Sequence, residues 1–337
     1  MIVTDSPISF PGLFGDWEFT AGEIALHVGR GVYWYGILIG LGVLAGLWLC
    51  SKLSGRFGLK EDHVLDLVLW GVPLGILGAR TYYVIFYLDL YRDADGAFNW
   101  GRAIAIWDGG LAIYGAVIAV FIMVFVYARC KKIPMGTLTD MGVMGLLIGQ
   151  AIGRWGNFMN REAFGAETTL PWRMRLLTTA GEYVEVHPTF LYECLWNLVG
   201  LALMVFIITK ARRFDGENTW FYFLWYGAGR FWIEGLRTDS LYLFDWTLMG
   251  QPIRVSQALS AVMVVVSALM LAYQLAARKP SPENLYVNRL AKAQAGAAEE
   301  EAAEADAGEE TENVKETDTE AAPETENAEN ETGGTEA

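Results

Sequence analysis

The sequence has few cysteines, few histidines and no dominant basic patch. Its 337 residues include only 3 Cys and 3 His, which excludes a scaffold held together by disulfides. Cys50, Cys130 and Cys194 each lie in or beside an apolar run, where a small buried thiol is the ordinary interpretation. Because no basic patch dominates the chain, nucleic-acid binding is not expected.

The acidic charge of the chain is confined to its C-terminal end. The formal net charge is -14, although 53% of the residues are hydrophobic. Residues 299–337 contain 16 Asp and Glu and one Lys, whereas residues 1–298 carry a net charge of +1. From about residue 295 the chain is rich in Glu, Ala, Thr and Asn and has no aromatic residue, which predicts a disordered tail. The tail is either solvated and dispensable or a docking or charge-repulsion element.

Long apolar runs dominate the rest of the chain. A membrane-spanning helix needs about 20 predominantly apolar residues, and seven stretches meet this requirement. We therefore predict an all-α integral membrane protein with a bundle of seven transmembrane helices. The predicted spans cover residues 32–52, 65–87, 110–129, 136–153, 189–209, 218–236 and 255–277.

Basic residues alternate between the loops and predict the orientation of the bundle. Cytoplasmic loops carry an excess of Lys and Arg. The first, third and fifth loops and the end of the last span are the basic ones, with Lys52, Arg56, Lys60, Arg129, Lys131, Lys132, Lys210, Arg212, Arg213, Arg278 and Lys279. This alternation places the N-terminus outside and the C-terminus in the cytoplasm.

Three regions follow from these patterns. Residues 1–31 are predicted to be an extracytoplasmic segment; with Asp5, Pro7 and Pro11 and no basic region, they do not resemble a signal peptide. Residues 32–279 form the predicted seven-helix transmembrane domain. Residues 280–337 form a predicted cytoplasmic linker and acidic tail.

Glycines inside the spans, such as those at 36, 40, 42 and 46, predict close helix packing.

Ionisable residues inside the predicted spans are the first functional candidates, because each costs roughly 2.5–3.5 kcal/mol to insert. In the sixth span, Arg230, Glu234 and Arg237 are spaced i, i+4 and i+7, so they share one helix face. Arg230 and Glu234 can pair and leave the guanidinium partly free. With the predicted orientation, this cluster lies in the outer half of the membrane.

Other polar residues converge on the same outer side. The fourth span ends in a stretch of charges, amides and glycines at 153–165, which includes Arg154, Asn157, Glu162 and Gly165. Such a stretch is typical of irregular backbone that lines a cavity. The outer ends of four other spans contribute Tyr35, Arg80, Tyr114 and His187. Arginines gathered there suit a phosphate, because guanidinium groups match phosphate oxygens.

Several motifs resemble those of the prolipoprotein diacylglyceryl transferase family. Residues 153–165 read GRWGNFMNREAFG and match the family signature G-R-x-G-N-F-x-N-x-E-x-x-G at all eight fixed positions. Further similar motifs follow in the family's order and cover about residues 30–275: Trp34-Tyr35-Gly36, Gly78-Ala79-Arg80, Trp107-x-Gly109-Gly110, His187-Pro188-Thr189-x-Leu191-Tyr192-Glu193 and Tyr226-Gly227-x-x-Arg230-x-x-x-Glu234-x-x-Arg237.

The resemblance implies a reaction and its partners. Members of this family transfer the diacylglyceryl group of phosphatidylglycerol to the thiol of the lipobox cysteine in a prolipoprotein signal peptide. The product is a thioether, glycerol 1-phosphate leaves, and no metal or cofactor is required. The enzyme would be a multi-pass protein of the cell membrane, with its active site towards the extracytoplasmic face.

The resemblance also implies roles for the residues found above. The catalytic residues would be Arg154, Arg230, Asn157, Glu162, Glu234, Tyr35 and Tyr114, and the residues binding phosphatidylglycerol would be Arg154, Arg230, Arg80, Gly165, Arg237 and His187. Tyr114 stands where some members have His, and Phe190 stands where many have Gln. The general base stays unassigned.

Two other kinds of protein fit parts of the pattern. A transporter or channel would use the arginines as an anion pathway, but such proteins often show inverted repeats and charges near the membrane midplane. This sequence has no evident repeat, and its polar groups gather towards one face. A receptor or scaffold whose tail binds a cytoplasmic partner would leave the outer arginines unexplained.

Overall fold

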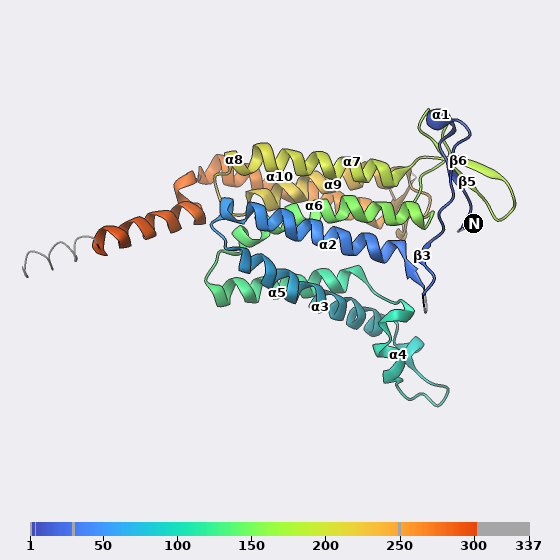
Figure 1. Ribbon diagram of the computed structural model, residues 1–337, viewed down its shortest axis with the longest axis horizontal. Helices are drawn as coiled ribbons and strands as arrows, with labels where there is room; N and C mark the ends of the chain where they lie inside the picture. The colour runs from blue at the N-terminus through green and yellow to red at the C-terminus, as the bar shows by residue number, and fades with distance from the viewer. Residues whose placement is uncertain (1, 4, 29–30, 249–250, 302–337) are drawn as a thin grey trace, which may run out of the picture. The chain divides into compact units, whose positions relative to one another are not determined.

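The computed structural model describes residues 2–3, 5–28, 31–248 and 251–301 (Figure 1). The chain divides into two compact units, Met1–Asn288 and Arg289–Ala337. The first unit is mostly helical and holds all the motifs named above. Residues 286–301 are helical, so the beginning of the predicted disordered tail, residues 295–301, is ordered as helix. The rest of the predicted tail lies outside the described residues.

Each of the seven predicted spans coincides with a long helix. The helices are α2 (Trp34–Leu53), α3 (Glu61–Phe86), α5 (Ile113–Lys131), α6 (Met135–Met159), α7 (Thr189–Leu203), α9 (Glu217–Leu236) and α10 (Val255–Ala272). Helix α7 continues through the π-helical turn η4 (Met204–Ile208) into α8 (Thr209–Ala211), and α10 continues into η5 (Tyr273–Arg278). Short helices are α1 (Pro11–Phe14), η1 (Ser54–Phe57), η2 (Leu88–Tyr91), α4 (Trp100–Ile104), η3 (Ile106–Asp108) and η6 (Pro282–Asn284).

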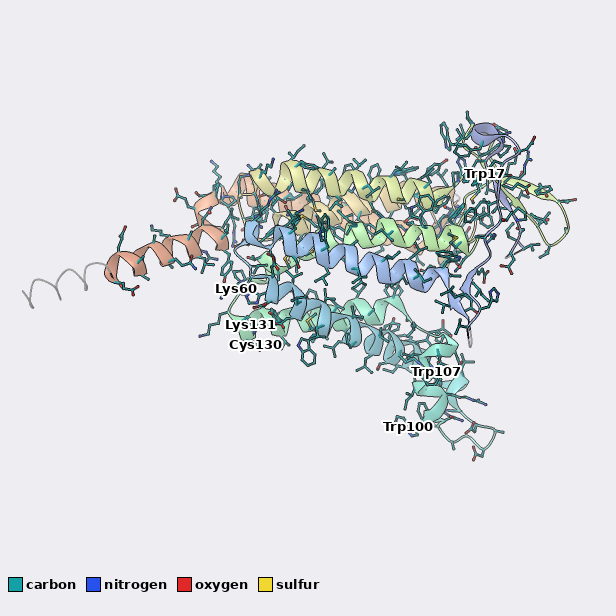
Figure 2. The ribbon with its side chains drawn as sticks, in the orientation of Figure 1. Trp17, Lys60, Trp100, Trp107, Cys130 and Lys131 are labelled. Carbon is teal, nitrogen blue, oxygen red and sulfur yellow. The ribbon has the colours of Figure 1, made fainter. Side chains whose placement is uncertain are left out.

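Six of the long helices are long and apolar enough to cross a membrane, so the chain is a multi-pass membrane protein. Helix α9 is not among these six; it carries Arg230 and Glu234, which lower its mean hydropathy. A seventh crossing therefore stays a prediction. Figure 2 shows Lys60 and Lys131 at one end of the bundle and Trp17, Trp100 and Trp107 at the other. Lys60 of the first loop and Lys131 of the third loop thus lie at the same end of the bundle.

The helices pack in antiparallel pairs, with α2 along α6, α3 along α5, and α9 along α10. Glycines permit the closest approaches. A Cβ added to Gly42 or Gly46 on α2 would lie 3.3 Å or 3.2 Å from the backbone of α6. The predicted packing role is thereby confirmed for Gly42 and Gly46. It is not confirmed for Gly36 and Gly40, whose added Cβ would meet no described atom within 4 Å.

The prediction of an all-α chain is wrong in one respect, because the structure contains small antiparallel sheets. Strands β1 (Ile8–Ser9), β2 (Glu18–Phe19), β5 (Met174–Leu177) and β6 (Tyr183–Val186) form a sheet in the order β2-β1-β5-β6, and two hairpins pair β3 (Ile24–Leu26) with β4 (Val32–Tyr33) and β7 (Tyr242–Leu248) with β8 (Gln251–Arg254). Apart from β7, the strands have four residues or fewer, which is too short for a clear alternation of apolar and polar residues.

The four-stranded sheet is fixed to one end of the helical bundle. Ile8, Leu176 and Val186 on the strands share a buried apolar cluster with Phe158 of α6 and Phe190 of α7. Arg161, directly after α6, is also buried and donates to the carbonyl oxygens of Ser6 and Ala21. The N-terminal segment is therefore held against the loop that follows α6, which carries the signature motif.

Candidate active site

A buried ionic network joins α6, α7 and α9. One carboxylate, that of Glu193 on α7, contacts two arginines: its Oε2 lies 2.5 Å from Nη2 of Arg154, and its Oε1 accepts from Nη1 of Arg230 at 3.0 Å. Nη2 of Arg230 lies 2.6 Å from Oε2 of Glu234, one turn further along α9. We call these four residues the Glu193 network. It brings together three of the predicted site residues: Arg154, Arg230 and Glu234.

The network balances its charges but leaves its arginines accessible. The side chains of Glu193 and Glu234 are 6% and 2% exposed, whereas those of Arg154 and Arg230 are 19% and 16% exposed. Burying charge is costly unless the charge is paired, and two carboxylates pair two guanidinium groups here. Each guanidinium has further N–H donors beyond these contacts. The arrangement can therefore hold an anion that arrives from the accessible side.

The signature segment extends the network through amide side chains. Nη1 of Arg154 donates to Oδ1 of Asn157 at 3.2 Å, and Nδ2 of Asn157 donates to Oε1 of Glu162 at 2.8 Å. Asn160 donates to the same oxygen of Glu162. Helix α6 ends at Met159, so Glu162 reaches back from the following loop. The predicted residues Arg154, Asn157 and Glu162 thus form one hydrogen-bonded chain.

Tyr35, in the first turn of α2, lies beside this chain. Its ring contacts α6 at Gly156, where an added Cβ would overlap the ring carbons. Gly156 sits between Arg154 and Asn157 in sequence. A side chain at position 156 would therefore push Tyr35 away from the network.

Gly165, His187 and Arg237 meet through the backbone. The N–H of Gly165 donates to the carbonyl of His187 at 2.9 Å, and the N–H of Ala166 donates to the carbonyl of Leu236 at 2.7 Å. A Cβ on Gly165 would lie 2.7 Å from Cβ of His187, so glycine permits this approach. The signature loop is thereby joined to the start of α7 and the end of α9.

Side-chain contacts of two of these residues are also defined. Nδ1 of His187 lies 3.1 Å from the Tyr192 hydroxyl, and burial lowers the pKa of His187, which favours its neutral form. Arg237 forms a bidentate pair with Asp239 at 2.8 and 2.7 Å. This hydrogen bonding lowers the pKa of Asp239.

Arg80 and Tyr114 have contacts outside the network. The Arg80 guanidinium is buried and donates to four backbone carbonyls, those of Arg102, Ala103, Gly109 and Gly110. Its described contacts hold the connection between α3 and α5. Tyr114 is 53% exposed, and its described ring contact is with Tyr82, at 6.3 Å between centroids. Their predicted roles in binding and catalysis stay predictions.

Glu193 is the central residue that the sequence analysis did not assign to the site, although it belongs to the His-Pro motif. The available signal was the one that selected Arg230, namely an ionisable residue in an apolar helix. Its partners Arg154 and Arg230 come from two other helices. Spacing along α7 alone could not have revealed them.

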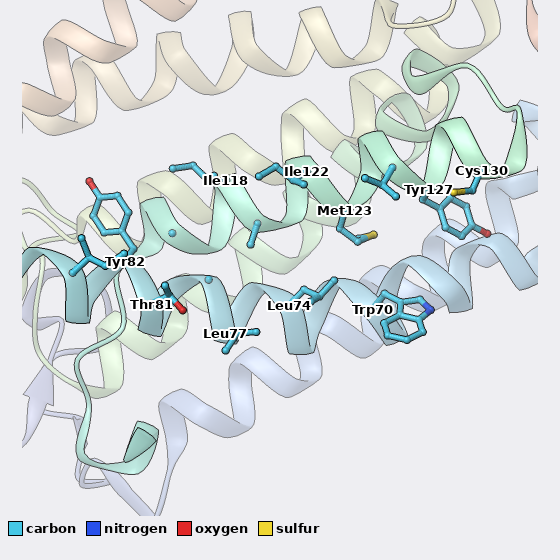
Figure 3. A pocket seen from close by; sticks show the side chains of 15 residues that line it. Trp70, Leu74, Leu77, Thr81, Tyr82, Ile118, Ile122, Met123, Tyr127 and Cys130 are labelled. Carbon is cyan, nitrogen blue, oxygen red and sulfur yellow. The ribbon is translucent and has the colours of Figure 1, made fainter. Parts of the chain in front are cut away.

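Two cavities among the described residues bear on the site. One, of about 500 Å³, is bordered by the loop after α6, including Glu162 and Gly165, by strand β6 and by the turn that follows β5. The larger, of about 700 Å³, lies between α3 and α5 and is lined by apolar side chains such as Leu74, Leu77 and Ile122 (Figure 3). The larger cavity contains no residue of the Glu193 network, so the chemistry is not expected there.

Comparison with known proteins identifies the family. The family model described as "Prolipoprotein diacylglyceryl transferase" matches residues 23–273. Three similar proteins all bear the name phosphatidylglycerol--prolipoprotein diacylglyceryl transferase. The protein of Finegoldia magna is 41% identical over 72% of this chain and 91% of its own length. That of Bacillus licheniformis is 40% identical over 76% and 91%, and that of Bacillus cereus strain G9842 is 44% identical over 71% and 87%. The chain belongs to the prolipoprotein diacylglyceryl transferase family.

Proposed function

We propose that the Glu193 network is where this chain transfers the diacylglyceryl group from phosphatidylglycerol to a prolipoprotein, the first step of lipoprotein maturation. The observation that carries the proposal is the shared carboxylate. The two carboxylate oxygens of Glu193 contact one arginine each, Arg154 and Arg230, so the two guanidinium groups lie beside the same carboxylate. Both guanidinium groups remain partly exposed. Two preorganised cations in a membrane protein of this family suit an anionic lipid headgroup.

The largest change in charge during the reaction occurs on the phosphate. The acceptor is the thiol of the lipobox cysteine; its sulfur forms a bond to the glyceryl carbon, and the carbon–oxygen bond to phosphate breaks. Glycerol 1-phosphate leaves with the electron pair, so negative charge grows on its oxygens. Preorganised donors aimed at developing charge are worth most in a site of low dielectric constant. Arg154 and Arg230 supply such donors, and Glu193 and Glu234 fix their positions.

The acceptor thiol must lose its proton, because the thiolate is the nucleophile. A nearby positive field lowers the pKa of a thiol, so the same arginines favour the thiolate once the substrates are bound. Asn157 and Tyr35 are proposed to orient oxygens of the lipid. Arg80, Gly165, Arg237 and His187 are proposed to shape the site for phosphatidylglycerol, and Tyr114 is proposed to contact the reacting groups.

We further propose that α9 is a seventh membrane crossing and that the site faces the extracytoplasmic side. Helix α9 packs along α10, which meets the criteria for a span. The basic loops lie at the end of the bundle opposite the signature loop, as Figure 2 shows for Lys60 and Lys131. The positive-inside rule then places the network outside.

The test is an assay of the purified chain with phosphatidylglycerol and a synthetic lipobox peptide. We expect the peptide to gain the mass of one diacylglyceryl group. Arg154→Ala and Arg230→Ala should each lower the turnover of the folded protein by about 100-fold or more. Thermal unfolding should change little in Arg154→Ala, because Glu193 keeps Arg230 as a partner, whereas Arg230→Ala removes the described partner of the buried Glu234 and should also lower stability. Arg175→Ala, on the sheet, is the matched control and should retain normal turnover. Near-normal rates in both network variants would overturn the proposed site.

A further inference from the structure

Helices α7 and α9 each carry a tryptophan followed four residues later by a glycine. The pairs are Trp196 and Gly200 on α7, and Trp225 and Gly229 on α9. A spacing of four places both members of a pair on one helix face. The two helices therefore present the same W-x-x-x-G pattern to each other, in opposite directions.

The two tryptophans interlock across the helix interface. Their rings stack with centroids 4.4 Å apart and planes 18° apart. Nε1 of Trp196 donates to the carbonyl of Trp225 at 2.9 Å, and Nε1 of Trp225 donates to the carbonyl of Trp196 at 2.9 Å. A buried indole N–H requires a partner, and each one finds it on the facing backbone. The interaction is reciprocal, so both helices are held in one register.

The two glycines make room for this arrangement. A Cβ added to Gly229 would overlap Nε1 and Cδ1 of Trp196, and one added to Gly200 would overlap the same atoms of Trp225. Both glycines are buried. Each indole therefore lies directly on the facing backbone, which is possible only because no side chain projects from that position.

The interlock lies immediately beside the Glu193 network. Glu193 precedes Trp196 by one helical turn, and Arg230 follows Gly229 directly. A slide of one residue between α7 and α9 would move these groups by about 1.5 Å along the helix axis. The contact between Glu193 and Arg230 is 3.0 Å long, so a slide of this size would change its length and angle. The register of the two helices and the geometry of the network are therefore linked.

We propose that the reciprocal tryptophans, with Gly200 and Gly229, form a register lock that positions Glu193 against Arg230 for catalysis. Trp196 and Trp225 are positioning residues: they act on the reaction through the network. The inference rests on the proposed function of the Glu193 network. The four residues of the lock lie outside both the signature segment and the His-Pro motif.

The test measures kcat, the KM for the lipobox peptide, and thermal unfolding of the full chain in detergent with phosphatidylglycerol. Trp196→Phe and Trp225→Phe remove one indole N–H each and keep an aromatic ring. We expect each to lower kcat about tenfold and to leave the peptide KM within about twofold. Because each substitution breaks the same lock, the double variant should lose about as much as one single variant. Trp48→Phe, at an exposed site on α2, is the control and should behave as the parent.

Gly229→Ala provides an independent arm. We expect a larger loss of kcat, because the added Cβ displaces the Trp196 ring. Gly40→Ala, whose Cβ would meet no described atom within 4 Å, is its control. If Gly229→Ala does not fold, the two Trp→Phe variants still decide the question.

The outcomes separate this inference from the proposed function. Normal kcat in Trp196→Phe and Trp225→Phe, combined with lost turnover in Arg230→Ala, would overturn the lock alone. The lock would also be overturned if the losses of kcat in the two single variants multiplied in the double variant. The same holds if each loss of kcat were explained by an equal loss of folded protein. Normal turnover in Arg230→Ala would overturn the proposed site itself.

Discussion

Helix α6 carries a buried ionic network near each of its ends, and the two networks differ in how their charges are satisfied. Near its end, Arg154 belongs to the Glu193 network. Near its start, about 21 Å away at about 1.5 Å per residue, Asp140 accepts from the N–H groups of Gly216 and Thr219 and pairs with Arg212. We call Asp140, Arg212 and Thr219 the Asp140 network.

The Asp140 network is closed, whereas the Glu193 network is open. The side chains of Asp140 and Arg212 are 0% and 2% exposed, and the Arg212 guanidinium lies over the Phe57 ring at 4.3 Å. Backbone N–H groups occupy both Asp140 oxygens, which fixes the loop before α9. In the Glu193 network the described partners are side chains, and the arginines remain accessible. The closed network thus fixes a loop of the fold, whereas the open network is the one for which we propose substrate binding.

The largest expected effect is on catalysis at the open network. Glu193→Gln removes the charge that holds both arginines, so we expect turnover to fall by about 100-fold or more. Glu234 still pairs with Arg230, so the protein should remain folded. Turnover with phosphatidylglycerol and lipobox peptide, measured beside thermal unfolding, tests this. If the variant loses stability but keeps its kcat, Glu193 has a structural role like that of Asp140, and its proposed role in catalysis is wrong.

The closed network should show the opposite response. Asp140→Ala leaves the Arg212 charge buried without its carboxylate, which typically costs about 3–5 kcal/mol. We expect a large drop in the unfolding temperature and in yield, while the protein that does fold keeps its kcat. Asp95→Ala, at an exposed loop position, serves as the control. Full stability of the Asp140→Ala variant would remove the distinction between the two networks.

A smaller effect should follow from crowding the open network. Gly156→Ala places a methyl group against the Tyr35 ring, and displacement of a positioned group can cost about 10- to 100-fold in rate. Gly142→Ala on the same helix is the matched control, since its Cβ would meet no described atom within 4 Å. We expect reduced turnover only in the first variant. Equal rates would show that Tyr35 has no fixed place beside Arg154.

The smallest effect concerns the sheet that adjoins the open network. Hydrogen bonds from Arg175 and Arg173 lower the pKa of Glu185 below its ordinary value. Its contribution to stability is therefore complete above the unfolded-state pKa of about 4.3 and is lost as pH falls through the lower folded-state pKa. Glu185→Gln should flatten this acid-side loss, measured as unfolding temperature between pH 3 and 6. Because the pair is accessible to solvent, the change should be small; an unchanged slope would contradict it.

Local patterns predicted the helices well because hydropathy is a local quantity. All seven expected stretches are helical, and Arg154, Asn157 and Glu162 of the signature segment are joined by hydrogen bonds. The small sheets were missed because two-residue strands such as β1 have no periodicity to detect. Glu193 was missed as a site residue because its importance lies in partners on other helices.

The sequence by itself determined the membrane class and the family, and it singled out three of the four residues that meet in the Glu193 network. The length of an apolar run determines which segments can span a membrane, and a family motif can be recognised from its own residues alone. The tertiary structure decided which charges meet: Glu193 joins Arg154 and Arg230 from helices far apart in the chain, and Arg80 turns to four backbone carbonyls. These pairings depend on helix packing and register, to which the reciprocal tryptophans and their glycines contribute, and no local pattern encodes them.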